Sequence, residues 1–352
     1  MLIFVVLLLV AAGLVILYST SAYNGQVKFH DPFHYLKKQG FATLLGLFGM
    51  ALIARVDYHK WVPLAIPAYV TSIILSVAVI FFGDEYNGSK RWLSLGPISF
   101  QPSEFAKVAV IFFLACLVSR NVQRMKRFRT MILMMIPVLP IVGLVGASNL
   151  STAIIILGIA VVLIFVADPK YVRFILMGSI GVGFMTVFLA MESYRLERLA
   201  IWRHPEQYEK GYQTLQGLYA IGSGGLFGRG LGNSVQKLGF LPEAQNDMIF
   251  SIICEELGLI GAGFIILLFL ILIWRFFVIS TKASDLLGAL IAAGAMAHMM
   301  IQVILNIAVV TNSIPNTGIT LPFISYGGTS VVFLLLEMGL VLSVSNYEGL
   351  RY

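Results

Sequence analysis

Long runs of apolar side chains recur from Met1 to Ser345, and short polar stretches separate most of them. Many of these runs approach the roughly 20 residues that an α-helix needs to cross a bilayer. We place ten membrane spans at about 1–19, 40–54, 62–82, 103–119, 131–146, 151–166, 172–191, 248–274, 286–308 and 331–345. The pattern predicts an all-α polytopic membrane protein with a single transmembrane domain over residues 1–352.

Composition supports a membrane protein, because 59% of the residues are hydrophobic and only 12% are charged, against about 25% charged in an average soluble domain. The first run, Met1–Ser19, has no basic segment before it and no small-residue cleavage site, so we expect a retained helix rather than a signal peptide. Cys116 and Cys254 lie inside apolar runs, which implies neither a disulfide framework nor a cysteine metal site.

The net charge of +7 comes from cations scattered over loops at the membrane boundary. This distribution favours phospholipids and anionic lipid substrates as partners over nucleic acid. The densest basic cluster of any short loop lies between Arg120 and Arg129, and such loops face the cytoplasm. That orientation puts both termini in the cytoplasm and the loops 20–39, 83–102, 192–247 and 309–330 on the opposite face.

The loop after the seventh run, about 192–247, is far longer than an ordinary connection, so we expect it to be functional. It contains a glycine-rich stretch at 221–232. No strand precedes these glycines, which argues against a nucleotide-binding loop. We find no inverted internal repeat of the kind that marks many transporters.

Ionisable side chains at membrane depth are costly and usually have a function or a partner. Glu104 and Lys107 stand at i, i+3 at the start of the fourth run, on one helical face. Two interpretations stay open: an ion pair that fixes helix packing, or a Lys107 that faces an anionic substrate. The group Lys90, Arg91 and Trp92 is equally typical of an interfacial anchor and of an anion-binding site.

Asp247 directly precedes an apolar run, and its position alone favours a helix N-cap. Glu255 and Glu256 follow two turns later, and we expect them to hold the loop against the helix. His30 and His34 have the i, i+4 spacing of helical metal ligands. A proline stands between them and no third ligand is near, so a zinc site is not favoured.

The segment 316–330 combines proline, paired glycines and hydroxyl side chains between two spans. Turn formation by itself explains Gly327 and Gly328. A cavity lining would also explain Ser325, Tyr326 and Thr329, because irregular backbone at membrane depth needs protein or water around it.

Four segments together resemble the shape, elongation, division and sporulation family of bacteria, the FtsW, RodA and SpoVE proteins. They are 87–107, which begins Asn87-Gly-Ser-Lys-Arg-Trp-Leu-Ser-Leu-Gly96, and 211–232, 241–258 and 319–330, in family order. The resemblance implies a peptidoglycan glycosyltransferase that polymerises lipid II at the outer face of the bacterial cytoplasmic membrane, for division or cell shape. It also implies a class B penicillin-binding protein as partner.

The resemblance identifies Asp247 with the family's essential aspartate, which reverses the preference for a helix cap. The matching segments also give the expected substrate-binding residues: Lys90, Arg91, Trp92, Glu104, Lys107, Gln213, Glu243, Ser325, Tyr326 and Thr329. One loop departs from the family pattern, because Ser148-Asn-Leu-Ser-Thr152 stands where the family reads close to Pro-Asp-Leu-Gly-Thr. The missing carboxylate at Asn149 puts a catalytic or metal role of this loop in doubt.

Polymerisation needs a base for the 4-hydroxyl of the acceptor sugar, and a partly buried Asp247 carboxylate suits that role. It also needs cations for the departing pyrophosphate, which Lys107 and Arg91 can supply while Glu104 holds Lys107 in place. The sequence requires no cofactor, and it leaves open whether a divalent cation, magnesium or manganese, takes part. Two other functions stay open: a lipid II flippase, and a non-catalytic scaffold that activates a penicillin-binding protein.

Overall fold

The structure, a computed structural model, describes residues 1–86, 89–95, 98–123, 128–168 and 199–347, with a few single residues between 170 and 183. Packing divides the chain into two compact units built from interleaved segments. Unit 1 consists of Met1–Thr43, Ile180–Leu272 and Gln302–Gly328, and unit 2 of Leu44–Ser179, Ile273–Ile301 and Thr329–Tyr352.

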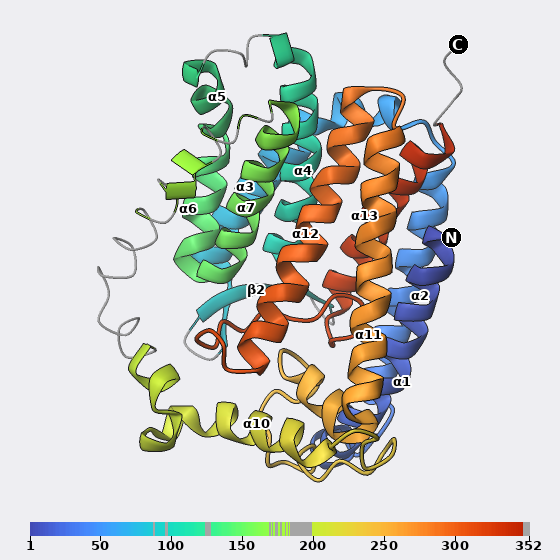
Figure 1. Cartoon of the computed structure of the whole chain (residues 1–352), viewed down its shortest axis with the longest axis vertical. Coiled ribbons are helices and arrows are strands. Elements are labelled where there is room, and N and C mark those ends of the chain that lie inside the picture. Colours follow the sequence, from blue (N-terminus) through green and yellow to red (C-terminus); the bar gives the residue numbers. More distant parts are fainter. Residues whose placement is uncertain are drawn as a thin grey trace. The chain divides into compact units, whose positions relative to one another are not determined.

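Helices dominate the described residues (Figure 1). They are α1 Leu2–Phe29, α2 His34–Ala54, the 3-10 turn η1 Tyr58–Leu64, α3 Ala65–Phe82, α4 Pro102–Asn121, α5 Phe128–Met135, α6 Val138–Ser148, α7 Leu150–Ala167, the 3-10 turns η3 Pro205–Gln207 and η4 Glu209–Gly211, α10 Tyr212–Gly224, α11 Ile249–Lys282, α12 Leu286–Val310 and α13 Gly328–Asn346.

The predicted class, an all-α polytopic membrane protein, is confirmed. Among the described residues, 7 helices are long and apolar enough to span a bilayer, or 8 if the pair α5 and α6, bent by 42°, is one span. Helix α2 is not among them, because Lys37 and Lys38 make its first turns polar. The predicted count of ten is therefore not confirmed, and the predicted span 172–191 falls largely outside the described residues.

In unit 2, α3, α4, α6 and α7 pack side by side (Figure 1). A small antiparallel sheet between α3 and α4 contacts three of these helices. Its strands are β1 Asp84–Tyr86, β2 Ser89–Leu95 and β3 Ile98–Phe100, in the order β1-β2-β3. We expected an irregular loop at 83–102 and missed these strands, although the dipeptide Asn87-Gly88 is a strong hairpin signal.

In unit 1, helix α1 continues to Phe29, ten residues beyond its predicted end at Ser19. It stops at His30, whose backbone is left-handed with φ 55° and whose amide donates to the carbonyl of Gln26. His34 begins α2 and stacks on Phe29 with ring centroids 3.8 Å apart. His30 and His34 therefore do not share one helix.

Helix α11 is broken at Gly258, where φ is 67° and ψ is −171°. A Cβ there would lie 2.4 Å from the Gly228 nitrogen and the Leu226 oxygen, so only glycine fits. The glycine-rich stretch 221–232 crosses this break and replaces helical hydrogen bonds. Leu259 and Ile260 donate to the carbonyls of Gly225 and Leu226 at 3.0 and 3.2 Å, and Arg229 and Gly230 donate to those of Glu255 and Glu256, both at 2.9 Å. The glycines thus let the loop clamp the helix backbone.

Candidate functional site

Asp247 lies in unit 1, at the turn where the long loop meets α11, and is only 7% exposed. The turn is fixed by Glu243, whose backbone is left-handed with φ 54°. The Glu243 carbonyl accepts from the amides of Asn246 and Met248 at 2.9 and 3.4 Å, and its carboxylate accepts from the Asn246 side chain. Asp247 therefore stands on a rigid support two residues before α11 begins.

Asn306 connects this turn to a second loop. It is fully buried in α12, and its side-chain nitrogen donates to the carbonyls of Asp247 at 2.9 Å and Ile319 at 2.7 Å. Sequence reasoning missed Asn306, although an amide within a long apolar run is a signal for such a role.

Ser325 and Tyr326 also support the turn. The Ser325 hydroxyl donates to the Asn246 carbonyl at 2.7 Å, and the Tyr326 amide donates to the Gln245 carbonyl at 2.9 Å. The Tyr326 ring packs edge-on against Tyr35 with centroids 4.9 Å apart, and burial raises the pKa of its hydroxyl. Both residues hold the backbone of the two residues before Asp247, and their contact with substrate stays a prediction.

Gln213 lies near the start of α10 and accepts a hydrogen bond from Asn316 at 3.2 Å. One turn later, α10 passes so close to the beginning of α11 that a Cβ on Gly217 would lie 2.4 Å from the Met248 side chain. Unit 1 therefore brings α10, the segment 311–327 and the Asp247 turn together. Of the predicted site residues, it contains Asp247, Gln213, Glu243, Ser325 and Tyr326.

Unit 1 also contains a buried charged network. The Glu256 carboxylate accepts from the Lys237 ammonium at 2.7 Å and from the Ser19 hydroxyl at 2.7 and 2.8 Å. The Glu255 carboxylate accepts from the Val235 amide at 3.1 Å and lies 3.4 Å from the Arg229 guanidinium. The predicted packing role of the two glutamates is confirmed, whereas their partners could not be read from the sequence.

The remaining predicted residues lie in unit 2. Glu104 and Lys107 form an ion pair of 2.9 Å at the start of α4, with both side chains buried. Ser330 donates to the Glu104 carboxylate at 2.7 Å, and the half-buried Thr329 donates to the Ser99 carbonyl at 3.4 Å. The ion-pair interpretation is therefore confirmed, and substrate contact by Lys107 stays a prediction.

A second buried pair in unit 2 was not predicted. His298 of α12 and Glu337 of α13 approach within 2.8 Å, and both are almost completely buried. Each is an ionisable residue within an apolar run, which was the available signal. The sequence could not reveal that the two side chains meet.

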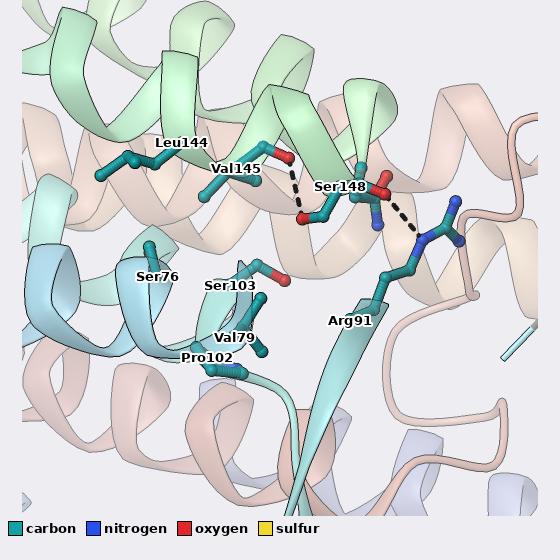
Figure 2. A pocket seen from close by; sticks show the side chains of 9 residues that line it. Ser76, Val79, Arg91, Pro102, Ser103, Leu144, Val145 and Ser148 are labelled. Carbon is teal, nitrogen blue, oxygen red and sulfur yellow. Dashed lines mark hydrogen bonds between the residues drawn. The ribbon is translucent and has the colours of Figure 1, made fainter. Parts of the chain in front are cut away.

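Arg91 projects from β2 toward the turn between α6 and α7 and donates from Nε to the Ser148 carbonyl at 3.0 Å (Figure 2). The two residues line a small pocket with residues of α3, α4 and α6. Asn149 caps α7 by accepting from the Thr152 amide at 3.2 Å, which an aspartate could also do. Lys90 is exposed and Trp92 half-buried on the same strand.

Within the described residues, no group of three or more His, Cys, Asp or Glu side chains could hold a metal ion. A divalent cation stays a prediction.

Comparison with known proteins identifies the family of this chain. The model of the FtsW, RodA and SpoVE family, described as cell cycle proteins, matches residues 1–349. Stage V sporulation protein E of Bacillus subtilis is 40% identical over 354 residues, which cover 99% of this chain and 97% of that protein. A probable peptidoglycan glycosyltransferase FtsW from a Geobacter species is 35% identical, covering 96% of this chain and 94% of the relative.

Solved structures support the same family assignment. A chain from a peptidoglycan synthase complex, studied for the coordination of polymerization and crosslinking, superposes with a TM-score of 0.82 at 29% identity and covers 99% of this chain and 97% of its own length. The rod shape determining protein RodA of Thermus thermophilus gives a TM-score of 0.72 at 29% identity, covering 99% and 96%. The chain belongs to the FtsW, RodA and SpoVE family of membrane proteins.

Proposed function

We propose that this chain is a peptidoglycan glycosyltransferase that polymerises lipid II, the undecaprenyl-pyrophosphate-linked disaccharide peptide, into glycan strands for division or cell shape. The observation that carries the proposal is the buried Asp247, held on a rigid turn in a chain whose relatives include probable peptidoglycan glycosyltransferases. A scaffold alone would not need a desolvated carboxylate fixed in this way.

In the proposed reaction, the 4-hydroxyl oxygen of one sugar bonds to the anomeric carbon of another. The bond from that carbon to the pyrophosphate oxygen breaks, and its electron pair leaves with the polyprenyl pyrophosphate. Asp247 takes the hydroxyl proton, because a carboxylate shielded from water accepts a proton more readily. Its backbone contacts to Asn306 support this role by fixing the carboxylate in position.

The pyrophosphate carries the charge that develops as the bond breaks, so it needs cations already in place. Lys107 and Arg91 are our choices, and the 2.9 Å contact to Glu104 would orient the Lys107 ammonium before substrate arrives. Glu104 then acts as a positioning residue.

The basic segment 120–129 supports placing the corresponding loop in the cytoplasm. Both termini then lie on the cytoplasmic side of a bacterial cytoplasmic membrane, and the reaction takes place at its outer face. A class B penicillin-binding protein is the proposed partner, and the likeness to a chain of a peptidoglycan synthase complex supports it.

The test is incubation of the purified full chain with labelled lipid II, with and without the penicillin-binding partner, followed by gel separation of the products. We expect a ladder of glycan strands. An empty gel under every partner and metal condition, together with movement of lipid II across vesicle membranes, would instead support the flippase.

A further inference from the structure

A second cavity lies in unit 2, at the end of α4 away from Glu104. It has a volume of about 470 Å³, within the range of ordinary ligand sites. Three segments line it: η1, the C-terminal end of α4 and the start of α12. Its lining residues are His59, Val62, Cys116, Ser119, Arg120, Asp285, Leu286 and Leu287.

The acidic side chains at this cavity already have hydrogen-bond and ion-pair partners in the protein. His59 bridges Asp57 and Asp285 through its two ring nitrogens, at 2.7 and 2.8 Å. Asp285 also accepts from the Tyr58 hydroxyl at 2.7 Å and from the Gly288 amide at 2.8 Å. These hydrogen bonds and ion pairs fix the side chains on this side of the cavity. They also leave the two carboxylates little capacity to bind a cation.

Arg120 differs from these groups. It is exposed, and within the part of the chain that the structure describes its guanidinium has no ion pair or hydrogen bond. Ser119 beside it donates to the Cys116 carbonyl at 3.1 Å, so its oxygen can still accept. Arg120 therefore gives the lining an open cationic donor, and a guanidinium is well suited to a phosphate.

Three candidate spans have an end at this cavity: Tyr58–Phe82 and Leu286–Val310 begin there, and Pro102–Asn121 ends there. Because the ends of spans lie near the lipid headgroups, we place the cavity at that depth. The rest of the lining, Val62, Cys116, Leu286 and Leu287, is mostly apolar. This lining suits a ligand that carries a phosphate next to a hydrocarbon chain at the depth of the lipid headgroups. A phospholipid has this structure.

We propose that this cavity binds an anionic phospholipid, with the headgroup phosphate on Arg120 and the start of an acyl chain against Leu286 and Leu287. The exposed Lys282 lies three residues before Asp285 and adds attraction for an anionic headgroup. The site is independent of the proposed glycosyl transfer.

The experiment is native mass spectrometry of the purified full chain, titrated with phosphatidylglycerol or phosphatidylcholine. We expect one phosphatidylglycerol to be retained in preference to phosphatidylcholine. Arg120→Gln should weaken its binding about tenfold, since a charge-assisted hydrogen bond is lost, and Arg120→Lys should restore part of the loss. Lys60→Gln is the matched control, because it removes the same charge at the same surface outside the cavity.

Equal losses in Arg120→Gln and Lys60→Gln would overturn the proposal, since diffuse surface charge would then explain the binding. Absence of a retained lipid would also overturn it. Soluble glycerol phosphate distinguishes the two sources of phosphate. If it binds as tightly as the lipid, the cavity takes a free phosphate compound and the lipid assignment is wrong.

Discussion

Glu256 and Lys237 show how single residues support the candidate site. Their side chains are 2% and 7% exposed, and their charged atoms lie 2.7 Å apart. Removing one member of such a pair leaves the other charge buried without compensation, which costs far more than losing a surface ion pair. The pair joins the long loop to the first half of α11, close in sequence to Asp247.

We therefore expect Glu256→Gln to lower the free energy of unfolding by about 3–5 kcal/mol. Arg229→Gln is the control, because that cation is 41% exposed and the Glu255 carboxylate keeps its hydrogen bond from the Val235 amide when the cation is removed. We expect about 0–1 kcal/mol for this variant. Thermal unfolding in detergent, followed by fluorescence, measures both. Similar losses in the two variants would show that burial does not set the strength of this network.

Asp285 gives a pH-dependent prediction. Burial raises the pKa of its carboxyl, but hydrogen bonds from Gly288, Tyr58 and His59 outweigh burial and hold the pKa below its usual value of 3.8. A lowered folded-state pKa contributes stability above the unfolded pKa, and this contribution is lost as the pH falls through the folded pKa.

The melting temperature of wild type should therefore exceed that of Asp285→Asn by a constant amount from neutral pH down to about pH 5. The difference should shrink below about pH 4, because protonation of the carboxyl removes its charge-assisted hydrogen bonds. A difference that stays constant down to about pH 2 would contradict the assigned hydrogen bonds.

At the scale of elements, the break in α11 explains what the glycine-rich stretch does. The hydrophobic pattern predicted one helix at 248–274, and α11 does form there. Its break could not be predicted, because it depends on the loop backbone approaching Gly258 from about thirty residues earlier in the chain. The glycines were visible in the sequence, but their partner was not.

Gly258→Ala should loosen this clamp, because a Cβ would collide with backbone atoms and alanine disfavours the positive φ. We expect a loss of about 1–3 kcal/mol and faster hydrogen exchange at the amides of Leu259 and Ile260. Gly263→Ala, in the same helix with open space at its Cβ, is the matched control and should be neutral or stabilising. Unchanged exchange in Gly258→Ala would contradict the clamp.

The cap of α7 gives a second prediction at this scale. Asn149→Ala should cost about 0.5–2 kcal/mol, because the Thr152 amide loses its acceptor. Asn149→Asp should be neutral or slightly stabilising, since a carboxylate caps equally well and suits the helix dipole. Unfolding of the three proteins in parallel is the measurement. An aspartate variant as unstable as the alanine variant would mean that the cap is unimportant.

At the scale of the whole molecule, the apolar pattern predicted the fold class and the positions of most helices, because the bilayer imposes a length and a polarity on each span. It did not predict the sheet at 84–100, whose short strands carry little periodicity. The sequence also could not predict the pairs Glu256 with Lys237 and His298 with Glu337. Such partners are far apart in sequence, and only folding brings them together.

The central claim is that Asp247 performs the proton transfer in lipid II polymerisation. Asp31 serves as the control, because it is a partly exposed carboxylate between α1 and α2 that pairs with Lys37 at 2.8 Å. The most direct measurement compares wild type, Asp247→Asn and Asp31→Asn for glycan strand formation and for lipid II binding in the same preparations. We predict that Asp247→Asn retains lipid II binding and loses polymer by a factor of about 10² or more, while Asp31→Asn matches wild type. Full polymerisation by Asp247→Asn would contradict the claim.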